Sequence, residues 1–332
     1  MDLRNPAVVA ACDKCAKKAI VLIRYSGAHL CEQHFCEFVE KRVKHELRRQ
    51  VQLRGGERVA IAVSGGKDST VALHLTSRIL GVRRDLSLCA LTVDEGIRGY
   101  RGSSIPIVAE HCRRLGIEHR VVSFEQLYGI SMDDIAESDR ELAACSYCGV
   151  LRRGAINRTA RDWGATHLAT GLNLDDTAQS ILMNFARGDV QRLARLGPHR
   201  RVQGGLIPRI QPLRSIPESE TTLYALVQNL KFHDLECPYA PEAMRNSYRE
   251  VVAQLEDMYP GTRHSILRSY DEMLPALETI YPAAKLGTCC CGEPTVSGKC
   301  KACELVESLA SRMTTPRTRA GTKRRSSCTR NP

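Results

Sequence analysis

The stretch Val59-Ala60-Ile61-Ala62-Val63-Ser64-Gly65-Gly66-Lys67-Asp68-Ser69 decides the fold of this chain. Its first five residues form an apolar run typical of a buried strand, and residues 70–80 carry apolar side chains at helical spacing. The two glycines between them predict a tight turn whose backbone N–H groups point outward at the start of a helix. Oriented amides, the helix dipole and the charge of Lys67 together favour a bound anion.

The spacing of this loop differs from that of a Walker A sequence, which places four residues between its first glycine and its Gly-Lys-Ser. Residues 64–69 instead resemble the PP-loop of ATP pyrophosphatases. That resemblance implies that the loop holds the β,γ-pyrophosphate of ATP while a substrate oxygen attacks the α-phosphate, giving an adenylate and pyrophosphate. The alternative is a glycine-rich turn without a ligand, but Lys67 and Asp68 have no packing reason to stand there.

Length and composition bound the architecture and the partners. The 332 residues suffice for one sizeable core with one or two small modules. The 48 Lys and Arg against 37 Asp and Glu give a net charge of +11, which suits a polyanionic partner, although many basic proteins bind no nucleic acid. The chain has neither an apolar run of about 18 residues nor a signal peptide, so we expect a cytoplasmic protein outside the membrane. Its 15 cysteines then indicate metal sites, because disulfides do not persist in that compartment.

Strands alternate with helices through the middle of the chain. The predicted strands are 59–63, 86–93, 119–124 and 167–171, and the predicted helices are 70–80, 102–115, 148–163 and 175–185. This order predicts a Rossmann-like α/β fold, a parallel sheet with helices on both faces and with ligands at the carboxyl ends of its strands. Residues 64–69, Asp94 and residues 171–176 all lie at such ends. Backbone groups at Val63 and Val93 are placed to meet the edge of adenine.

The N-terminal cysteines have the spacing of a zinc site. Cys12-x-x-Cys15 and Cys31-x-x-His34 are separated by 15 residues that read as a strand and a turn, which fits a tetrahedral Cys3His site. Cys36 falls outside this spacing. Residues 36–53 predict a basic helix that either packs on a neighbour and exposes its charges or lies along a phosphate backbone.

A second zinc ribbon is expected near the C-terminus. Cys300-x-x-Cys303 supplies one pair of ligands, and Cys291 belongs to the other. The partner of Cys291 is Cys289 or Cys290, because a regular C-x-x-C would put Thr288 at the first position, and we favour Cys289. Beyond residue 313 the chain is rich in Thr, Arg, Lys and Ser without periodicity, which is typical of a disordered basic tail.

A third cysteine set lies within the predicted sheet domain. Cys145-Ser146-Tyr147-Cys148 fits a redox dithiol, half of a zinc site or part of an iron–sulfur site. With Cys237 it gives three thiolates, one too few for a closed zinc site but suited to a 4Fe–4S cluster with one open iron. A persulfide or disulfide pair without metal is the alternative. Cys89, Cys112 and Cys328 are expected to be buried or incidental.

The order of these motifs over residues 12–305 resembles the tRNA 2-thiouridine synthetases, most closely the archaeal NcsA and eukaryotic cytoplasmic wobble-uridine thiolase branch. The resemblance lies in the flanking cysteine motifs and in S-G-G-K-D-S (64–69), V-D-E-G-I-R-G-Y-R (93–101), C-S-Y-C-G-V-L-R-R (145–153), A-T-G-L-N-L-D-D-T-A-Q (169–179), M-N-F-A-R-G-D-V-Q-R-L (183–193) and E-C-P-Y (236–239). It implies an ATP-dependent tRNA uridine 2-sulfurtransferase. Such an enzyme adenylates the C2 oxygen of the wobble uridine (position 34) and replaces it with sulfur, releasing AMP and pyrophosphate.

The same resemblance implies roles for individual residues. Val63, Ser64, Gly65, Gly66, Lys67, Asp68, Ser69, Val93 and Asp94 would surround ATP and Mg²⁺. Asp176, with Asp175 beside it, would lie by the α-phosphate, Arg152 would stand where some relatives have a lysine, and Gly171 would let the backbone approach the nucleotide. Cys145, Cys148 and Cys237 would hold the 4Fe–4S cluster, and its open iron would bind incoming sulfide. Leu172 departs from the family, which commonly has a histidine there.

These motifs divide the chain into a zinc finger (1–36), a basic linking helix (37–54), a PP-loop ATP pyrophosphatase domain (55–285), a zinc ribbon (286–312) and a basic tail (313–332). The expected partners are tRNA and a sulfur donor, either sulfide or a ubiquitin-like thiocarboxylate protein, and a homodimer is allowed. Three other functions compete. They are 2-thiolation of a T-loop uridine or an anticodon-loop cytidine, a non-catalytic zinc-ribbon RNA-binding protein, and a PP-loop amidotransferase or lysidine-type synthetase.

Overall fold

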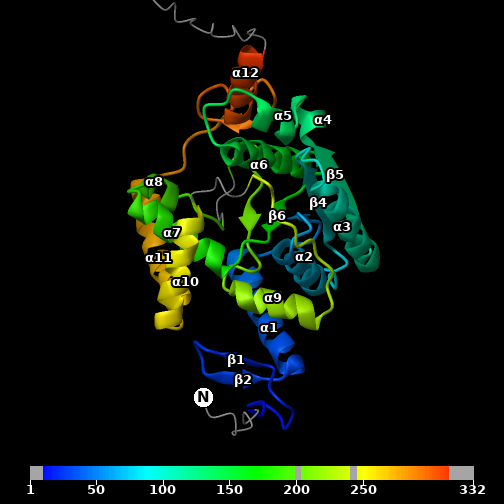
Figure 1. Cartoon of the computed structure of the whole chain (residues 1–332), viewed down its shortest axis with the longest axis vertical. Coiled ribbons are helices and arrows are strands. Elements are labelled where there is room, and N and C mark those ends of the chain that lie inside the picture. Colours follow the sequence, from blue (N-terminus) through cyan, green and yellow to red (C-terminus); the bar gives the residue numbers. More distant parts are fainter. Residues whose placement is uncertain (1–9, 199–202, 240–244, 314–332) are drawn as a thin grey trace, which may run out of the picture.

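A five-stranded parallel sheet forms the centre of the computed structural model, which describes residues 10–198, 203–239 and 245–313 (Figure 1). The sheet has the order β5-β4-β3-β6-β7, formed by β3 (Arg58–Ala62), β4 (Ser87–Asp94), β5 (Glu118–Ser123), β6 (His167–Thr170) and β7 (Arg209–Ile210). Every neighbouring pair is parallel, so the predicted Rossmann-like fold is confirmed. The strand order reverses between β3 and β6, and doubly wound folds bind their ligands in the crevice at that point.

Different helices cover the two faces of the sheet, because successive side chains of β3 point in opposite directions. Val59 and Ile61 belong to one core, with α2 (Lys67–Leu80) and α3 (Arg101–Leu115). Ala60 belongs to another core, with the end of α6 (Ala144–Asp162). All three side chains are fully buried, which explains why β3 reads as a continuous apolar run.

The remaining helices form a lobe beside the sheet and the cover around it (Figure 1). In the lobe, α7 (Leu174–Ala186), α8 (Val190–Leu193) and α11 (Thr262–Ile280) share one apolar core, and α10 (Arg245–Met258) packs on α7. Elsewhere, α4 (Phe124–Tyr128) and α5 (Met132–Glu137) follow β5, and α9 (Glu218–Val227) packs on α2 and on α1 (Glu32–Gln50). Each described helix is too short or too polar to cross a lipid bilayer.

Two small cysteine-bearing modules lie at opposite ends of the molecule (Figure 1). The first contains the hairpin of β1 (Val21–Ile23) and β2 (Ala28–Leu30), and the second contains β8 (Gly287–Thr288), β9 (Pro294–Thr295) and α12 (Lys301–Met313). The apolar side chains along one face of α1 are buried in the same core as Val59 and Ile61, so this basic helix packs on its neighbours. The predicted tail lies outside the described residues, apart from Met313 at the end of α12, and Cys328 lies outside them with it.

Three helices begin earlier than the sequence predicted. Helix α1 starts at Glu32 rather than residue 36, α2 at Lys67 rather than 70, and α6 at Ala144 rather than 148. Apolar periodicity misses the first turn of a helix, because that turn faces a loop rather than the core. The shift at α6 matters most, because it places Cys145 and Cys148 together on one helical turn. As expected, Cys89 and Cys112 are buried.

Candidate nucleotide site and cysteine centres

The loop between β3 and α2 is held in shape from both sides. Gly65 has a φ of +87°, and a Cβ at this position would lie 2.8 Å from Cβ of Ser104, so only glycine fits. The backbone N–H of Ser64 donates to Oγ of Ser69 at 3.1 Å, and the two hydroxyl oxygens lie 3.0 Å apart. Gly66 is the N-cap of α2, and glycine has no side chain with which to cap the helix. The N-terminus of α2 is therefore available to an anion.

Lys67, the first residue of α2, lies between two carboxylates. Its Nζ is 2.8 Å from Asp68 and 2.6 Å from Glu218. Burial acts to lower the pKa of Lys67, but the two carboxylates outweigh it and raise the pKa above its ordinary value. Lys67 is therefore charged at neutral pH. Sequence analysis missed Glu218; its only signal is Pro217-Glu218, a proline and an acid of the kind that begin helices.

An asparagine joins the first turns of α2 and α7. The side-chain oxygen of Asn173 accepts from the backbone N–H of Asp176 at 2.9 Å, and Oδ2 of Asp176 accepts from the backbone N–H of Asn173 at 3.3 Å. The side-chain amide of Asn173 also donates to Asp68 at 3.1 Å. Asp68 and Asp176 are thus held at the same end of the sheet, as the strand-end argument predicted. Asn173 was also missed by sequence analysis, although an Asn three residues before an Asp is a capping signal.

Asp175 faces other partners than its neighbour Asp176. It accepts from the backbone N–H of Glu218 at 2.8 Å and lies 3.1 Å from Nε of Arg263 on α11. Burial raises the pKa of Asp175, and the Glu218 N–H and Arg263 oppose that rise. Asp175 therefore ties α7 to α9 and α11, whereas Asp176 is bonded to Asn173, and both carboxylates act on Arg249 of α10.

Gly171 makes a close approach, but to protein backbone. A Cβ at Gly171 would lie 2.8 Å from Cα and 2.9 Å from N of Ser69. The structure shows this approach to the first turn of α2, and the approach of the Gly171 backbone to the nucleotide stays a prediction. Leu172, at the position of the missing histidine, is 40% exposed.

A buried ion pair contacts the loop between β3 and α2. Arg101 and Glu95, only 4% and 1% exposed, form two contacts of 2.5 and 2.8 Å. Arg101 also donates to the carbonyl of Ser64 at 2.6 Å. Arg152, which is half exposed, approaches the same carboxylate at 3.5 Å. Glu95 and Arg101 lie within the 93–101 motif, yet sequence analysis did not single them out.

Part of the backbone at the ends of β3 and β4 is already hydrogen-bonded within the protein. The N–H of Val63 donates to the carbonyl of Leu91, and its carbonyl accepts from the hydroxyl of Thr92 at 2.9 Å. The Val63 carbonyl keeps one lone pair for a ligand such as adenine. Val93 is buried, and the side chain of Asp94 accepts from the N–H of Gly96 at 2.9 Å.

The three cysteines of the predicted cluster meet near Arg152. Burial raises the pKa of Cys148 to about 11, with Arg152 opposing this effect and with Cys237 and Cys145 among the acidic neighbours that add to it. Cys148 and Cys237 pack against one apolar cluster, and the Cys145 thiol donates to the carbonyl of Tyr239 at 3.2 Å. These three thiols are therefore brought into one region from α6 and from the segment after α9.

The spacing of these thiols bears on which metal group they suit. Within the described residues, the groups of three or more ligand atoms that all lie within 4.8 Å of one another are the N- and C-terminal groups, and Cys145, Cys148 and Cys237 do not form such a group. In a 4Fe–4S cluster each thiolate binds a different iron, so the ligands stand farther apart than around one ion. The donor set accordingly fits a 4Fe–4S cluster better than a single tetrahedral zinc ion.

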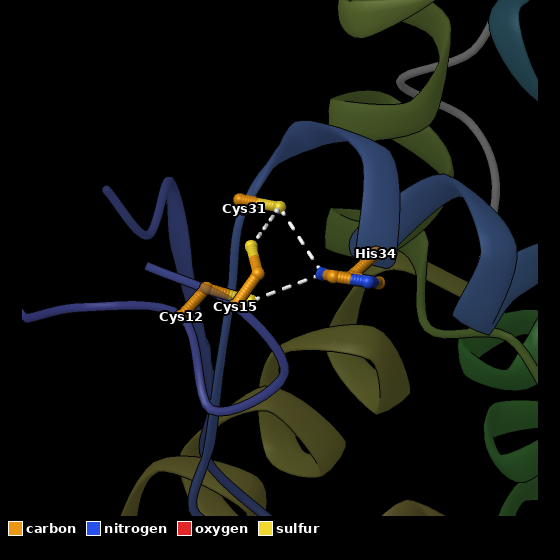
Figure 2. Close-up of side chains that lie close together, drawn as sticks. All are labelled: Cys12, Cys15, Cys31 and His34. Atoms are coloured by element: carbon orange, nitrogen blue, oxygen red, sulfur yellow. Dashed lines mark hydrogen bonds between the residues drawn. The ribbon is translucent and has the colours of Figure 1, made fainter. Parts of the chain in front are cut away.

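Figure 2 shows the N-terminal group, in which Cys12, Cys15, Cys31 and His34 converge. Sγ of Cys15 and Sγ of Cys31 are 3.7 Å apart, and Nδ1 of His34 is 3.3 Å from Sγ of Cys12. Zinc bonds of about 2.3 Å to sulfur and about 2.0 Å to nitrogen place tetrahedral ligands about 3.5–3.8 Å apart. The group therefore has the spacing of a zinc site.

The C-terminal group consists of Cys289, Cys291, Cys300 and Cys303. Its sulfur atoms lie 3.8 Å apart between Cys289 and Cys303 and 3.5 Å apart between Cys291 and Cys300. Cys290 is exposed and lies outside the group. Backbone N–H groups of Cys291 and Cys300 lower the pKa of Cys289 to about 6, so that its thiolate, the form that binds metal, is favoured.

Two family models match the chain. A PP-loop domain matches residues 37–256, and the N-terminal LIM domain of the 2-thiouridine synthetase TtuA matches residues 12–36. Together these matches cover the nucleotide site, the cluster cysteines and the N-terminal group.

Individual relatives match over nearly the whole chain. The tRNA 2-thiolation protein NcsA of Haloferax volcanii is 42% identical over 316 residues, which cover 90% of this chain and 98% of that protein. Cytoplasmic tRNA 2-thiolation protein 1 of Bos taurus is 38% identical over 309 residues, which cover 90% and 87%. The solved structure of the U34-tRNA thiolase NcsA from Methanococcus maripaludis with its 4Fe–4S cluster superposes with a TM-score of 0.73 at 36% identity, covering 80% and 88%.

Proposed function

We propose that this chain, which belongs to the family of PP-loop tRNA 2-thiolation proteins, is an ATP-dependent sulfurtransferase that converts the wobble uridine of tRNA (position 34) to 2-thiouridine. One observation carries the proposal: the β3–α2 loop and the three thiols lie on either side of a short series of charged residues. Arg101 donates to Ser64 of the loop and pairs with Glu95, and Arg152 neighbours both Glu95 and Cys148. A phosphate site and a sulfur site side by side suit activation followed by thiolation.

Activation is the task of the loop. The C2 oxygen of uridine is a poor leaving group, and adenylation turns it into part of AMP, a good one. Lys67 and the N–H groups at the start of α2 would stabilise the charge that grows on the departing pyrophosphate. Asp68 and Asp176 offer the hard oxygen ligands that Mg²⁺ prefers, and the ion would neutralise phosphate charge there. Arg152 would add a cation to the nucleotide site.

Sulfur delivery is the task of the cysteines. Cys145, Cys148 and Cys237 would hold the 4Fe–4S cluster, which supplies an open iron for sulfide when it is bound. The chain itself would hold the uridine between the loop and the thiols, and such a fixed orientation favours attack at C2. The base must leave the anticodon stack to reach that place.

The remaining parts support a tRNA-binding role. The N- and C-terminal groups would each hold a structural zinc ion, and the exposed cations of α1 (Lys41, Lys44 and Arg48) together with the net charge of +11 suit the tRNA backbone. The sulfur donor, a homodimer and the cytoplasmic location stay predictions, and the name of the bovine relative supports the last of these.

Reconstitution tests this function. Protein purified without oxygen is mixed with a tRNA transcript, ATP, Mg²⁺ and sulfide, and the digested nucleosides are analysed by mass spectrometry. We expect 2-thiouridine at position 34 with AMP and pyrophosphate formed in equal amounts, and no product on a transcript with cytidine at position 34. Thiolation of a T-loop uridine or an anticodon-loop cytidine would contradict the assigned position. Binding of tRNA without ATP cleavage would favour the non-catalytic RNA-binding alternative.

A further inference from the structure

One carboxylate bridges two cations beside the phosphate loop. Oε1 of Glu218 lies 2.6 Å from Nζ of Lys67, and Oε2 of Glu218 contacts the guanidinium of Arg249. Lys67 begins α2, Glu218 begins α9 and Arg249 comes from α10, so three separate helices meet at this carboxylate. The two cations are near enough to contact a single group that carries two oxygens.

Lys67 also pairs with Asp68, and Asp175 and Asp176 lie near Arg249, but Glu218 contacts both cations and offsets their mutual repulsion. Glu218 supplies one negative charge and two oxygens. A pyrophosphate group supplies more charge and more oxygens over the same span, and both lysine and arginine bind phosphate strongly. Glu218 and a phosphate at the loop therefore compete for the same pair of cations.

We infer that Arg249 is a phosphate-binding residue of this site and that Glu218 is an internal anion which the β,γ-phosphates displace from Lys67 and Arg249. The inference rests on the proposed function for the identity of the nucleotide. Glu218 keeps a favourable position after the exchange, because the first turn of a helix stabilises negative charge.

This competition acts on both the substrate and the product. ATP brings the phosphates that replace Glu218, and the pyrophosphate formed by adenylation remains in competition with that carboxylate. Its departure returns Lys67 and Arg249 to Glu218, so the carboxylate promotes release of pyrophosphate and opposes the reverse reaction. AMP lacks the β- and γ-phosphates and does not reach this pair.

Calorimetric titration of the full-length protein with inorganic pyrophosphate, at a fixed Mg²⁺ concentration and without tRNA, tests the inference. We expect Arg249→Gln to weaken pyrophosphate binding about tenfold, because one charge-assisted contact is lost. Glu218→Gln should tighten it about tenfold, because the competing anion is removed. In the double variant, the gain from Glu218→Gln should shrink, because only one of the two released cations is still present.

Matched variants control for general charge effects. Glu250→Gln on α10 and Arg268→Gln on α11 change the same charges at exposed positions and should leave the affinity unchanged. Glu218→Asp, which keeps the charge, should behave more like the parent than like Glu218→Gln. Equal affinities of Arg249→Gln and Arg268→Gln, or weaker binding by a folded Glu218→Gln, would overturn the inference. Since neither tRNA nor sulfur is present, a failure to thiolate position 34 leaves this result unaffected.

Discussion

At the scale of single residues, the nucleotide site depends on charge that is balanced within the protein. Lys67 is paired with Asp68 and Glu218, and it lies outside the apolar cores. Its role is therefore separable from stability. Gly171 has the opposite character. It carries no charge, but its lack of a side chain allows β6 and α2 to approach each other, so its role lies in stability.

Lys67→Ala should abolish adenylation while leaving the fold and tRNA affinity nearly intact. Removal of one group that stabilises transition-state charge lowers the rate by about 10²–10³-fold. The measurement is tRNA-dependent AMP formation, accompanied by thermal unfolding and a tRNA binding curve. Arg268→Ala, an exposed cation on α11, serves as the control. Equal ATP turnover in the variant and the parent would remove Lys67 from the phosphate site.

Gly171→Ala should destabilise the protein, because its new Cβ would lie 2.8 Å from the backbone of Ser69. Overpacking of this kind costs about 1–3 kcal/mol in the free energy of unfolding. Gly102→Ala on α3 is the matched control, since a Cβ there meets only open space among the described atoms. That control should stabilise the protein by about 0.5–1 kcal/mol, because alanine favours a helix. Both values come from chemical denaturation, and equal stabilities would show that β6 and α2 are not in close contact.

At the scale of helices and strands, the sequence predicted which residues form each motif, whereas the tertiary fold determines which other residues that motif contacts. Strand-end motifs gave the loop, Asp94 and Asp176 because parallel strands bring their carboxyl ends together. Glu218, Asn173 and Arg263 escaped notice, since a capping or helix-start signal predicts where a helix begins but not which distant side chain its residues contact. Their partners come from helices that only tertiary packing places side by side.

Two adjacent cysteines between β8 and β9, Cys289 and Cys290, allow a test of which one binds zinc. Cys289 is 3% exposed and belongs to the four-thiol group, whereas Cys290 is exposed and outside it. Cys289→Ser should therefore lower the zinc content by about one ion per chain and lower the melting temperature, because structural zinc contributes folding energy directly. Cys290→Ser should retain both. Zinc is measured by inductively coupled plasma mass spectrometry, and the opposite pattern would assign the ligand to Cys290.

At the scale of the whole molecule, the active region is assembled from parts that are distant in the sequence. Tyr25 and Arg42 both bind Glu220 of α9, at 2.7 and 2.9 Å, so the N-terminal module is anchored to the same helix that begins with Glu218. At the other end, the C-terminal group shares an apolar cluster with Cys148 and Cys237. Each module thus packs against the central part of the chain, the N-terminal one through α9 and the C-terminal one through the apolar cluster.

Cys145, Cys148 and Cys237 should act as one unit, so that serine at any of the three removes thiolation and spares adenylation. The loop activates the uridine oxygen without help from sulfur, and therefore the two half-reactions should separate. Loss of any thiolate leaves the cluster with too few protein ligands, so the three variants should look alike, whereas the parent should carry about four irons per chain. A persulfide mechanism predicts a different pattern, in which one cysteine is strictly required and another only helps. The measurements are iron content, AMP formation and 2-thiouridine for each variant under anaerobic conditions, with Cys290→Ser as the control. Full thiolation by iron-free protein would decide against the cluster and in favour of the persulfide.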